Sequence, residues 1–212
     1  MPDIVLILDE STSMRDHKES YIEGVNTLLT TQKQLNPNAN FTLIKFSSDV
    51  TTLCVDHKMH TIPEFTSEHY KPDGVTSLYD AIGHGFNLKH NNNVNNDNNV
   101  IMIILTDGED NHSSKFTFKT ISENIDYLKI RGWEFVFIAT NQNVTQIGSR
   151  LGIDTCLAYD ASKESIARVA NACSIAIGHA IQKWSGIPNQ YTSQVMPTDV
   201  RDLMNEMGNF TI

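Results

Sequence analysis

The fold of this chain is decided by residues 4–13, IVLILDESTS. The stretch opens with five apolar residues in a row, Ile4–Leu8, and the carboxylate of Asp9 follows at once. A short apolar run without alternation is typical of a strand that is buried on both faces of a parallel sheet. We therefore expect Ile4–Leu8 to form the central strand, with polar residues just beyond its carboxyl end.

The same pattern, an apolar run followed by polar residues, occurs again later in the chain. Val100–Leu105 contains six apolar residues without a break and is followed by the polar cluster TDGED at residues 106–110. Trp133–Ala139 predicts a third buried strand and Thr155–Ala158 a short fourth one. Repetition of one pattern at this spacing indicates parallel strands of one sheet.

Helical patterns lie between these strands. Apolar residues from Tyr21 to Leu29 recur at helical spacing and predict a helix of about 20 residues that ends before Asn36. Phe41–Phe46 and Val50–Val55 are interpreted as a hairpin at one edge of the sheet. Further helices are predicted at Ser77–Lys89, Phe116–Arg131, Val144–Leu151 and Ser162–Trp184. The alternation predicts an α/β fold with a Rossmann-like open, mostly parallel sheet, helices on both faces and one antiparallel edge hairpin.

The domain organisation follows from where these patterns stop. With 212 residues the chain is long enough to bury a core without disulfide or zinc staples. Residues 1–184 are interpreted as one domain. Residues 185–212 are interpreted as a C-terminal extension that packs on the domain or contacts a partner, and within them only Val200–Met207 has a helical pattern. No feature indicates an obligate oligomer.

Charge and cysteine content narrow the possible partners and the location. The chain has 16 Lys and Arg against 25 Asp and Glu, which gives a net charge of −9, and it has no basic run. Nucleic-acid and anionic-membrane binding are therefore disfavoured, because both need a positive surface. The three cysteines are widely spaced, and the N-terminus has no basic, long apolar leader. We expect an intracellular, cytoplasmic protein without a membrane segment.

The candidate site lies where the buried strands end. Ligands of such sheets bind at the carboxyl ends of the strands, near the switch point. Asp9 with Ser11 and Ser13 offers one carboxylate and two hydroxyls at alternate positions. Hard oxygen donors of this kind are what Mg²⁺ or Mn²⁺ prefers. Thr76, before a predicted helix, and Asp107, after a buried strand, are expected to add ligands, with water completing the shell.

These residues resemble the metal-ion-dependent adhesion site of von Willebrand factor type A domains. The family pattern is Asp-X-Ser-X-Ser, then a distant Thr, then an Asp after a buried strand. Here it reads Asp9, Ser11 and Ser13, then Thr76, then Asp107. Five matched positions in three separate segments, in the expected order, make this signal more specific than a lone Asp-X-Ser.

The resemblance covers residues 3–183 and is greatest to the freestanding single-domain A proteins of bacteria, phages and viruses. Residues 133–138 and the following Asn141 and Gln142 are similar to that group. Glu10 and Thr12 stand where small residues are usual, and Val75 stands where Gly is common. These departures concern the affinity and loop shape of the site.

The resemblance implies a function without catalysis. In the family, the metal keeps one coordination position open for an acidic side chain of a partner protein. Of the two carboxylates and three neutral hydroxyls, some are expected to act through water, which leaves a divalent ion incompletely neutralised and able to accept one more anionic oxygen. The same ion would locally reverse the sign of an otherwise acidic surface.

Other roles for these residues stay open at this point. Asp9, Thr76 and Asp107 could each cap a helix instead. Glu10 is expected to face solvent or the rim of the site, and the acidic residues Asp73, Glu109 and Asp110 are expected to shape loops or attract cations rather than bind them directly.

Two alternative functions also remain. Asp9 could be the nucleophile of a Mg²⁺-dependent phosphoryl-transfer enzyme, but the acid needed two residues later is replaced by Ser11. The domain could also be an accessory module that delivers a client to an ATPase or assembly machine.

Overall fold

A computed structural model of the chain describes residues 1–92, 99–140, 142–159 and 163–186. The C-terminal extension beyond Gly186, including the helical pattern at Val200–Met207, lies outside the described residues. Residues 93–98, NVNNDN, also lie outside them.

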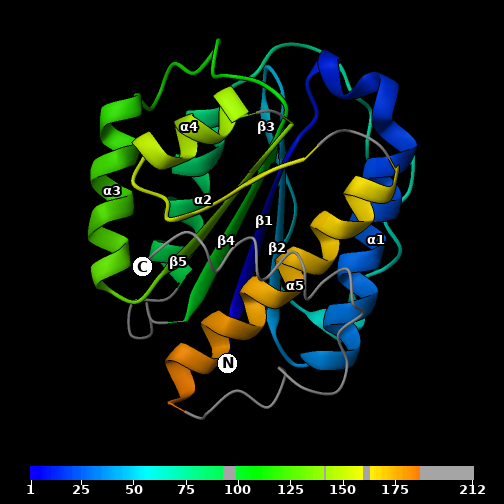
Figure 1. The fold of residues 1–212 in the computed structure, drawn as a ribbon, viewed down its shortest axis with the longest axis vertical. Helices are drawn as coiled ribbons and strands as arrows, with labels where there is room; N and C mark the ends of the chain where they lie inside the picture. The colour runs from blue at the N-terminus through cyan, green and yellow to red at the C-terminus, as the bar shows by residue number, and fades with distance from the viewer. Residues whose placement is uncertain (93–98, 141, 160–162, 187–212) are drawn as a thin grey trace.

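The described strands form one sheet (Figure 1). Its order is β3-β2-β1-β4-β5-β6. Every neighbouring pair is parallel except β2 and β3, which form the antiparallel edge pair. The strands are β1 (Asp3–Asp9), β2 (Asn40–Phe46), β3 (Val50–Lys58), β4 (Val100–Thr106), β5 (Glu134–Ala139) and β6 (Thr155–Ala158).

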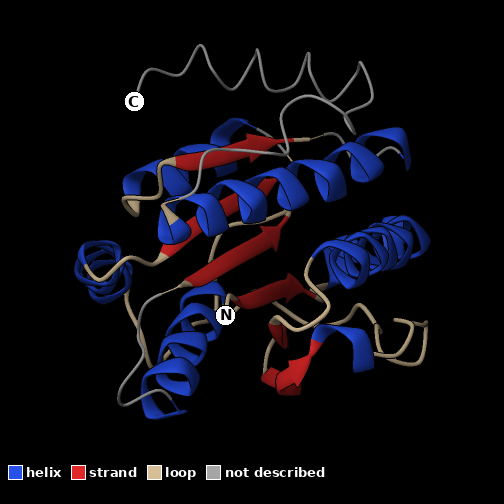
Figure 2. Ribbon diagram, turned by 90° about the horizontal axis from the view of Figure 1, so that it is seen from below, coloured by secondary structure: helices blue, strands red, loops and turns tan. Residues whose placement is uncertain are grey.

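Helices cover both faces of this sheet (Figure 2). On one face lie α1 and α5, and on the other lie α2, α3 and α4. The helices are α1 (Lys18–Leu35), α2 (Leu78–Asn92), α3 (Phe118–Ile130), α4 (Gln142–Arg150) and α5 (Lys163–Ser185), with short 3₁₀ helices η1 (Thr12–His17) and η2 (Met59–Thr61). The α/β fold expected from the sequence is confirmed.

Burial explains why the central strands contain no polar interruption. All seven residues of β1 are buried, and so are all seven of β4. Along β1, Leu6 and its alternate neighbours pack under α1 and α5, whereas Ile7 and its alternate neighbours pack under α2. Because each face of the strand meets a helix layer, both sets of side chains must be apolar.

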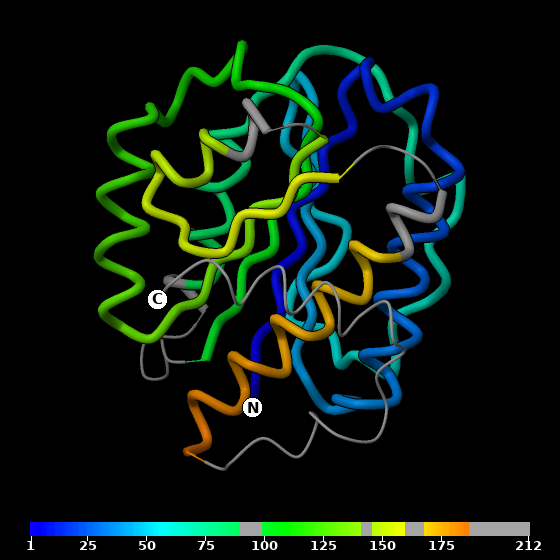
Figure 3. Tube along the Cα trace, in the orientation of Figure 1, coloured from blue at the N-terminus to red at the C-terminus, as the bar shows by residue number. Residues whose placement is uncertain are grey.

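The sheet has its switch point between β1 and β4. From β1 the chain passes through α1 to β2 on one side, whereas β4 pairs with β1 on the other side. The loops that leave β1 and β4 both lie at the end of the sheet away from the N-terminus (Figure 3). The fold therefore brings the segments after Asp9 and after Thr106 together at one edge.

Candidate metal centre

The carboxylate of Asp9 is fixed by hydrogen bonds at both oxygens. Asp9 is the last residue of β1 and is 0% exposed. The backbone N–H of Ser11 donates to Oδ1 at 2.7 Å, and the hydroxyl of Thr106 donates to Oδ2 at 2.6 Å. Thr106 is the last residue of β4, so the two neighbouring strands jointly set the orientation of this carboxylate.

A chain of hydroxyls connects the loop after β1 with the loop after β4. The Ser11 and Ser13 hydroxyls lie 3.1 Å apart, and the Ser13 hydroxyl donates to Oδ1 of Asp107 at 2.7 Å. Ser11 is buried, whereas Ser13 is exposed. Four of the five residues expected at the site are thus joined by hydrogen bonds of the described structure.

Thr76 belongs to a third loop, which packs against the loop after β4. Its backbone N–H donates to the side-chain oxygen of Asn111 at 2.9 Å. Its carbonyl accepts from the backbone N–H groups of Asn111 and His112 at 3.0 and 3.2 Å. A Cβ placed on Gly108 would lie 3.8 Å from the Thr76 hydroxyl, so this hydroxyl lies beside the residue that follows Asp107.

Gly74 lets the third loop pack closely against the β2–β3 turn while its carbonyl binds the loop after β1. Its φ is +81°, a left-handed conformation that favours glycine, and a Cβ there would lie 2.5 Å from the Ser48 hydroxyl. The Gly74 carbonyl accepts both the backbone N–H and the hydroxyl of Thr12, at 3.1 and 2.8 Å. Thr12 therefore ties the loop after β1 to the loop that carries Thr76.

The electrostatics of the site favour a bound cation. Burial raises the pKa of Asp9 to about 6, against the lowering effect of its hydrogen bonds, and the charge of Asp107 raises it further. Burial likewise raises the pKa of Asp107, although the Ser13 hydrogen bond lowers it. No Lys or Arg among the described residues forms a salt bridge with either carboxylate. Two negative charges that nearby donors compensate only in part are what a divalent cation would stabilise.

The donor set fits a hard divalent cation. The two carboxylates and three hydroxyls of this edge are all oxygen donors, which Mg²⁺ and Mn²⁺ accept. Within the described ranges, no group of three or more His, Cys, Asp and Glu side chains is placed to hold a metal. A hydroxyl-rich site with two carboxylates is consistent with that result.

One neighbouring residue differs from the sequence expectation. Glu10 was expected to face solvent or the rim, but it is only 8% exposed. Its carboxylate pairs with Lys45 at 2.9 Å and also accepts the backbone N–H of Lys71. Burial is tolerated because Lys45 compensates the charge, so Glu10 ties the loop after β1 to β2 and to the loop around Lys71.

Two other acidic neighbours, Asp110 and Asp73, form contacts outside the hydroxyl chain. Asp110 accepts hydrogen bonds from the Tyr79 backbone N–H at 3.2 Å and from the Ser113 hydroxyl, and so shapes the loop after β4. Asp73 is exposed and pairs with Arg15 at 3.3 Å. Neither residue forms a hydrogen bond with the hydroxyl chain in the described structure.

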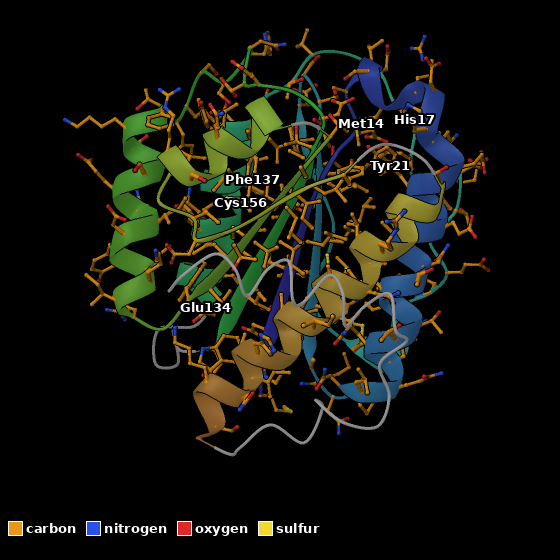
Figure 4. All side chains as sticks on the ribbon, viewed as in Figure 1. Met14, His17, Tyr21, Glu134, Phe137 and Cys156 are labelled. Atoms are coloured by element: carbon orange, nitrogen blue, oxygen red, sulfur yellow. The ribbon has the colours of Figure 1, made fainter. Side chains whose placement is uncertain are left out.

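Several supporting residues could not be recognised from the sequence. Asn111 binds the backbone of Thr76, and Thr106 binds Asp9, yet neither matches a ligand pattern. The loop after β1 continues into η1, which buries Met14, and α1 follows directly (Figure 4). The charge of His17, at the end of η1, lowers the pKa of Asp107, though by less than burial raises it. Only the hydroxyl of Thr106, directly before Asp107, offered a local signal.

Comparison with solved structures shows the same fold in longer chains. The pilus adhesin SpaC from Lactobacillus rhamnosus GG, in its open conformation, matches with a TM-score of 0.66 at 16% identity over 86% of this chain and 30% of that one. A von Willebrand factor type A structure from Catenulispora acidiphila matches with a TM-score of 0.62 at 14% identity, over 84% and 43%. Proximal thread matrix protein 1 from the mussel byssus, with a zinc-occupied MIDAS motif, matches with a TM-score of 0.56 at 19% identity, over 85% and 48%. This chain thus spans less than half the length of each.

No curated protein sequence matches the chain, but one family model does. The model of the von Willebrand factor type A domain matches residues 3–166, a range that includes all five residues expected at the site. None of the described helices is long and apolar enough to cross a membrane. Because the family match extends over most of its length, the chain belongs to the von Willebrand factor type A domain family.

Proposed function

We propose that this protein is a protein-binding module that depends on a divalent cation, Mg²⁺ or Mn²⁺, held by Asp9, Ser11, Ser13, Thr76 and Asp107. The observation that carries the proposal is the hydrogen-bonded chain from Ser11 through Ser13 to Asp107, at the switch point of the sheet. Such a chain already holds oxygen donors from two loops close together. The domain is proposed to span residues 1–184, with residues 185–212 as an extension.

The partner is proposed to present an acidic side chain. The protein carries a net charge of −9, so an acidic partner would be repelled from most of its surface. A divalent cation that these carboxylates and hydroxyls hold partly through water would supply a local positive charge and an open coordination position. The side chains of the chain itself would orient that cation, and the exposed Ser13 would place it where a partner can reach.

Mg²⁺ or Mn²⁺ is preferred to zinc for this chain. The MIDAS motif of the mussel byssus protein is occupied by zinc, so zinc is the ion to be weighed against Mg²⁺ and Mn²⁺ here. The five residues proposed here include no His or Cys, the ligands that strengthen zinc binding. An all-oxygen site favours the harder ions.

The geometry supports a role for Asp9 in binding rather than as a nucleophile. Phosphoryl-transfer enzymes of this architecture that use an aspartate nucleophile need a general acid two residues after it. The residue two positions later is Ser11, whose hydroxyl lies beside that of Ser13. We therefore propose a module without catalytic activity.

We expect peptides selected by display against the full chain in Mg²⁺ to be enriched in Asp or Glu. Their binding should be lost in EDTA and restored by added Mg²⁺ or Mn²⁺, because the acidic side chain would complete the metal shell. Interferometry with and without EDTA measures this binding. The control variant Asp49→Ala, which keeps all five proposed ligands, should bind the same peptides in Mg²⁺. Asp49 lies in the exposed β2–β3 turn and is not one of the five proposed ligands. Peptides that bind equally well in EDTA would show that the proposed function is wrong.

A further inference from the structure

Three buried tyrosines lie beneath the proposed metal site. Tyr21 comes from α1, Tyr70 from the loop before α2, and Tyr159 from the residue after β6. Tyr21 and Tyr70 pack edge to face with ring centroids 6.3 Å apart, and Tyr21 and Tyr159 do so at 6.2 Å. The three are 0 to 5% exposed, so each hydroxyl must find a partner inside the protein.

The hydroxyl of Tyr70 binds the main chain of a proposed ligand. It donates to the backbone carbonyl of Asp9 at 2.6 Å. The ring of Tyr70 is 0% exposed and also packs against Phe65, with centroids 5.9 Å apart. Phe65 is in turn fixed by two backbone hydrogen bonds to the side chain of Asn26 on α1, at 2.7 and 2.8 Å. The Tyr70 hydroxyl therefore holds the Asp9 carbonyl from a rigid base.

Tyr70 is also the first of a series of links between two ligand-bearing loops. After it, the Lys71 backbone N–H donates to the Glu10 carboxylate, and the Asp73 backbone N–H donates to the Glu10 carbonyl at 2.9 Å. Gly74 then accepts from Thr12. Residues 70–74 thus run alongside residues 9–12, and Thr76 follows two residues later.

We propose that Tyr70 is a positioning residue of the metal site, which sets the main chain of Asp9 relative to the loop that carries Thr76. Tyr70 does not contact the cation; it acts through the Asp9 carbonyl. This inference rests on the proposed function, because it assumes that Asp9 and Thr76 are ligands. Partners of this outer kind commonly change metal affinity when removed.

The neighbouring tyrosine pair supplies a matched control. The hydroxyls of Tyr21 and Tyr159 hydrogen bond to each other. Tyr159→Phe therefore removes a buried hydroxyl from the same cluster, with a similar loss of one internal hydrogen bond, but leaves the bond from Tyr70 to Asp9 in place. A purely structural role of the cluster would affect the two variants alike.

The test is isothermal titration of Mg²⁺ and Mn²⁺ into the full chain and the two variants. Tyr70→Phe is expected to weaken binding about tenfold. Tyr159→Phe is expected to stay within about twofold of the unchanged protein. Both variants should lower the urea midpoint of the metal-free protein to a similar extent. Replacement of Tyr70 by 4-aminophenylalanine, which keeps a donor at the same place, should restore most of the affinity and remains informative if Tyr70→Phe does not fold.

Three results would overturn the inference. Binding by Tyr70→Phe equal to that of the unchanged protein would show that the bond to Asp9 does not position the site. Equal weakening in both variants would indicate a general loosening of the core. If the unchanged protein bound neither ion, the proposed function itself would be wrong, and that outcome is distinct from the other two.

Discussion

Asp107→Ala is expected to weaken Mg²⁺ binding by about 100-fold or more while the fold persists. Removing one of two carboxylates removes a unit charge next to the cation, and such a pair contributes about 4 kcal/mol near a protein surface. The fold should persist because burial raises the pKa of Asp107, so its charge does not favour the folded state. Isothermal titration calorimetry measures the affinity, and circular dichroism checks the fold.

The control for this variant is Asp49→Ala, which makes the same change of side chain and charge in an exposed turn at the same edge of the sheet. Its Mg²⁺ affinity should stay within about threefold of the unchanged protein, because Asp49 is exposed and water and salt screen an exposed charge. If both variants weakened binding equally, the effect would be one of net charge. If Asp107→Ala still bound Mg²⁺ as the unchanged protein does, Asp107 would not be a ligand.

Asp80→Ala is expected to lower the free energy of unfolding by about 3 kcal/mol. The Asp80 carboxylate, in the first turn of α2, accepts three backbone N–H groups from the loop after β4. The donors are Ser114, Lys115 and Phe116, at 3.0, 2.9 and 2.8 Å. Asp80 is only 7% exposed, so the variant would leave donors without their acceptor. Urea denaturation measures the loss.

Acid should remove the same stabilisation in the unchanged protein. Burial acts to raise the pKa of Asp80, but the three backbone donors outweigh it and hold this pKa below its usual value. A carboxyl with a lowered folded pKa stabilises the protein above its unfolded pKa of about 4, and the contribution is lost as the pH falls further. The difference between the unchanged protein and Asp80→Ala should therefore shrink towards pH 2.

The matched control for Asp80 is Glu123→Ala on α3. The Glu123 side chain is 64% exposed and pairs with Lys119 at 3.7 Å. Exposed pairs of this type contribute about 0.5 kcal/mol or less. Loss of stability in Asp80→Ala no larger than in the control would contradict the role assigned to Asp80.

The strands and the edge of the sheet where the candidate residues lie could be predicted because their signals are local. Ile4–Leu8 and Val100–Leu105 contain no polar residue, a composition that is required only of a strand covered on both faces. The structure confirms both segments as buried strands. The five proposed ligands follow buried strands or precede a helix, so the fold class alone brings their segments to one edge. Their role as ligands stays a prediction, as does the intracellular location.

The interactions that support the site could not be predicted because they join distant segments. The sequence around Glu10 predicts an exposed acid, because its partner Lys45 lies 35 residues later, on β2. Tyr70 lies in a loop without periodicity, and its target is the main chain of Asp9. Lys89 fits the polar end of a helix, yet it is 0% exposed and pairs with Asp3 at 3.6 Å and with Asp56. In each case a buried charge or hydroxyl is accepted only because a partner from another strand or loop compensates it.

The most direct test of the metal site is a crystal structure grown with Mn²⁺, with anomalous differences measured at the manganese absorption edge. One strong peak is expected at the switch point, within about 2.5 Å of oxygen atoms from Asp9, Ser11, Ser13, Thr76 or Asp107, or of waters bound to them. A peak at another place, or none at this edge at saturating Mn²⁺, would contradict the proposed metal site.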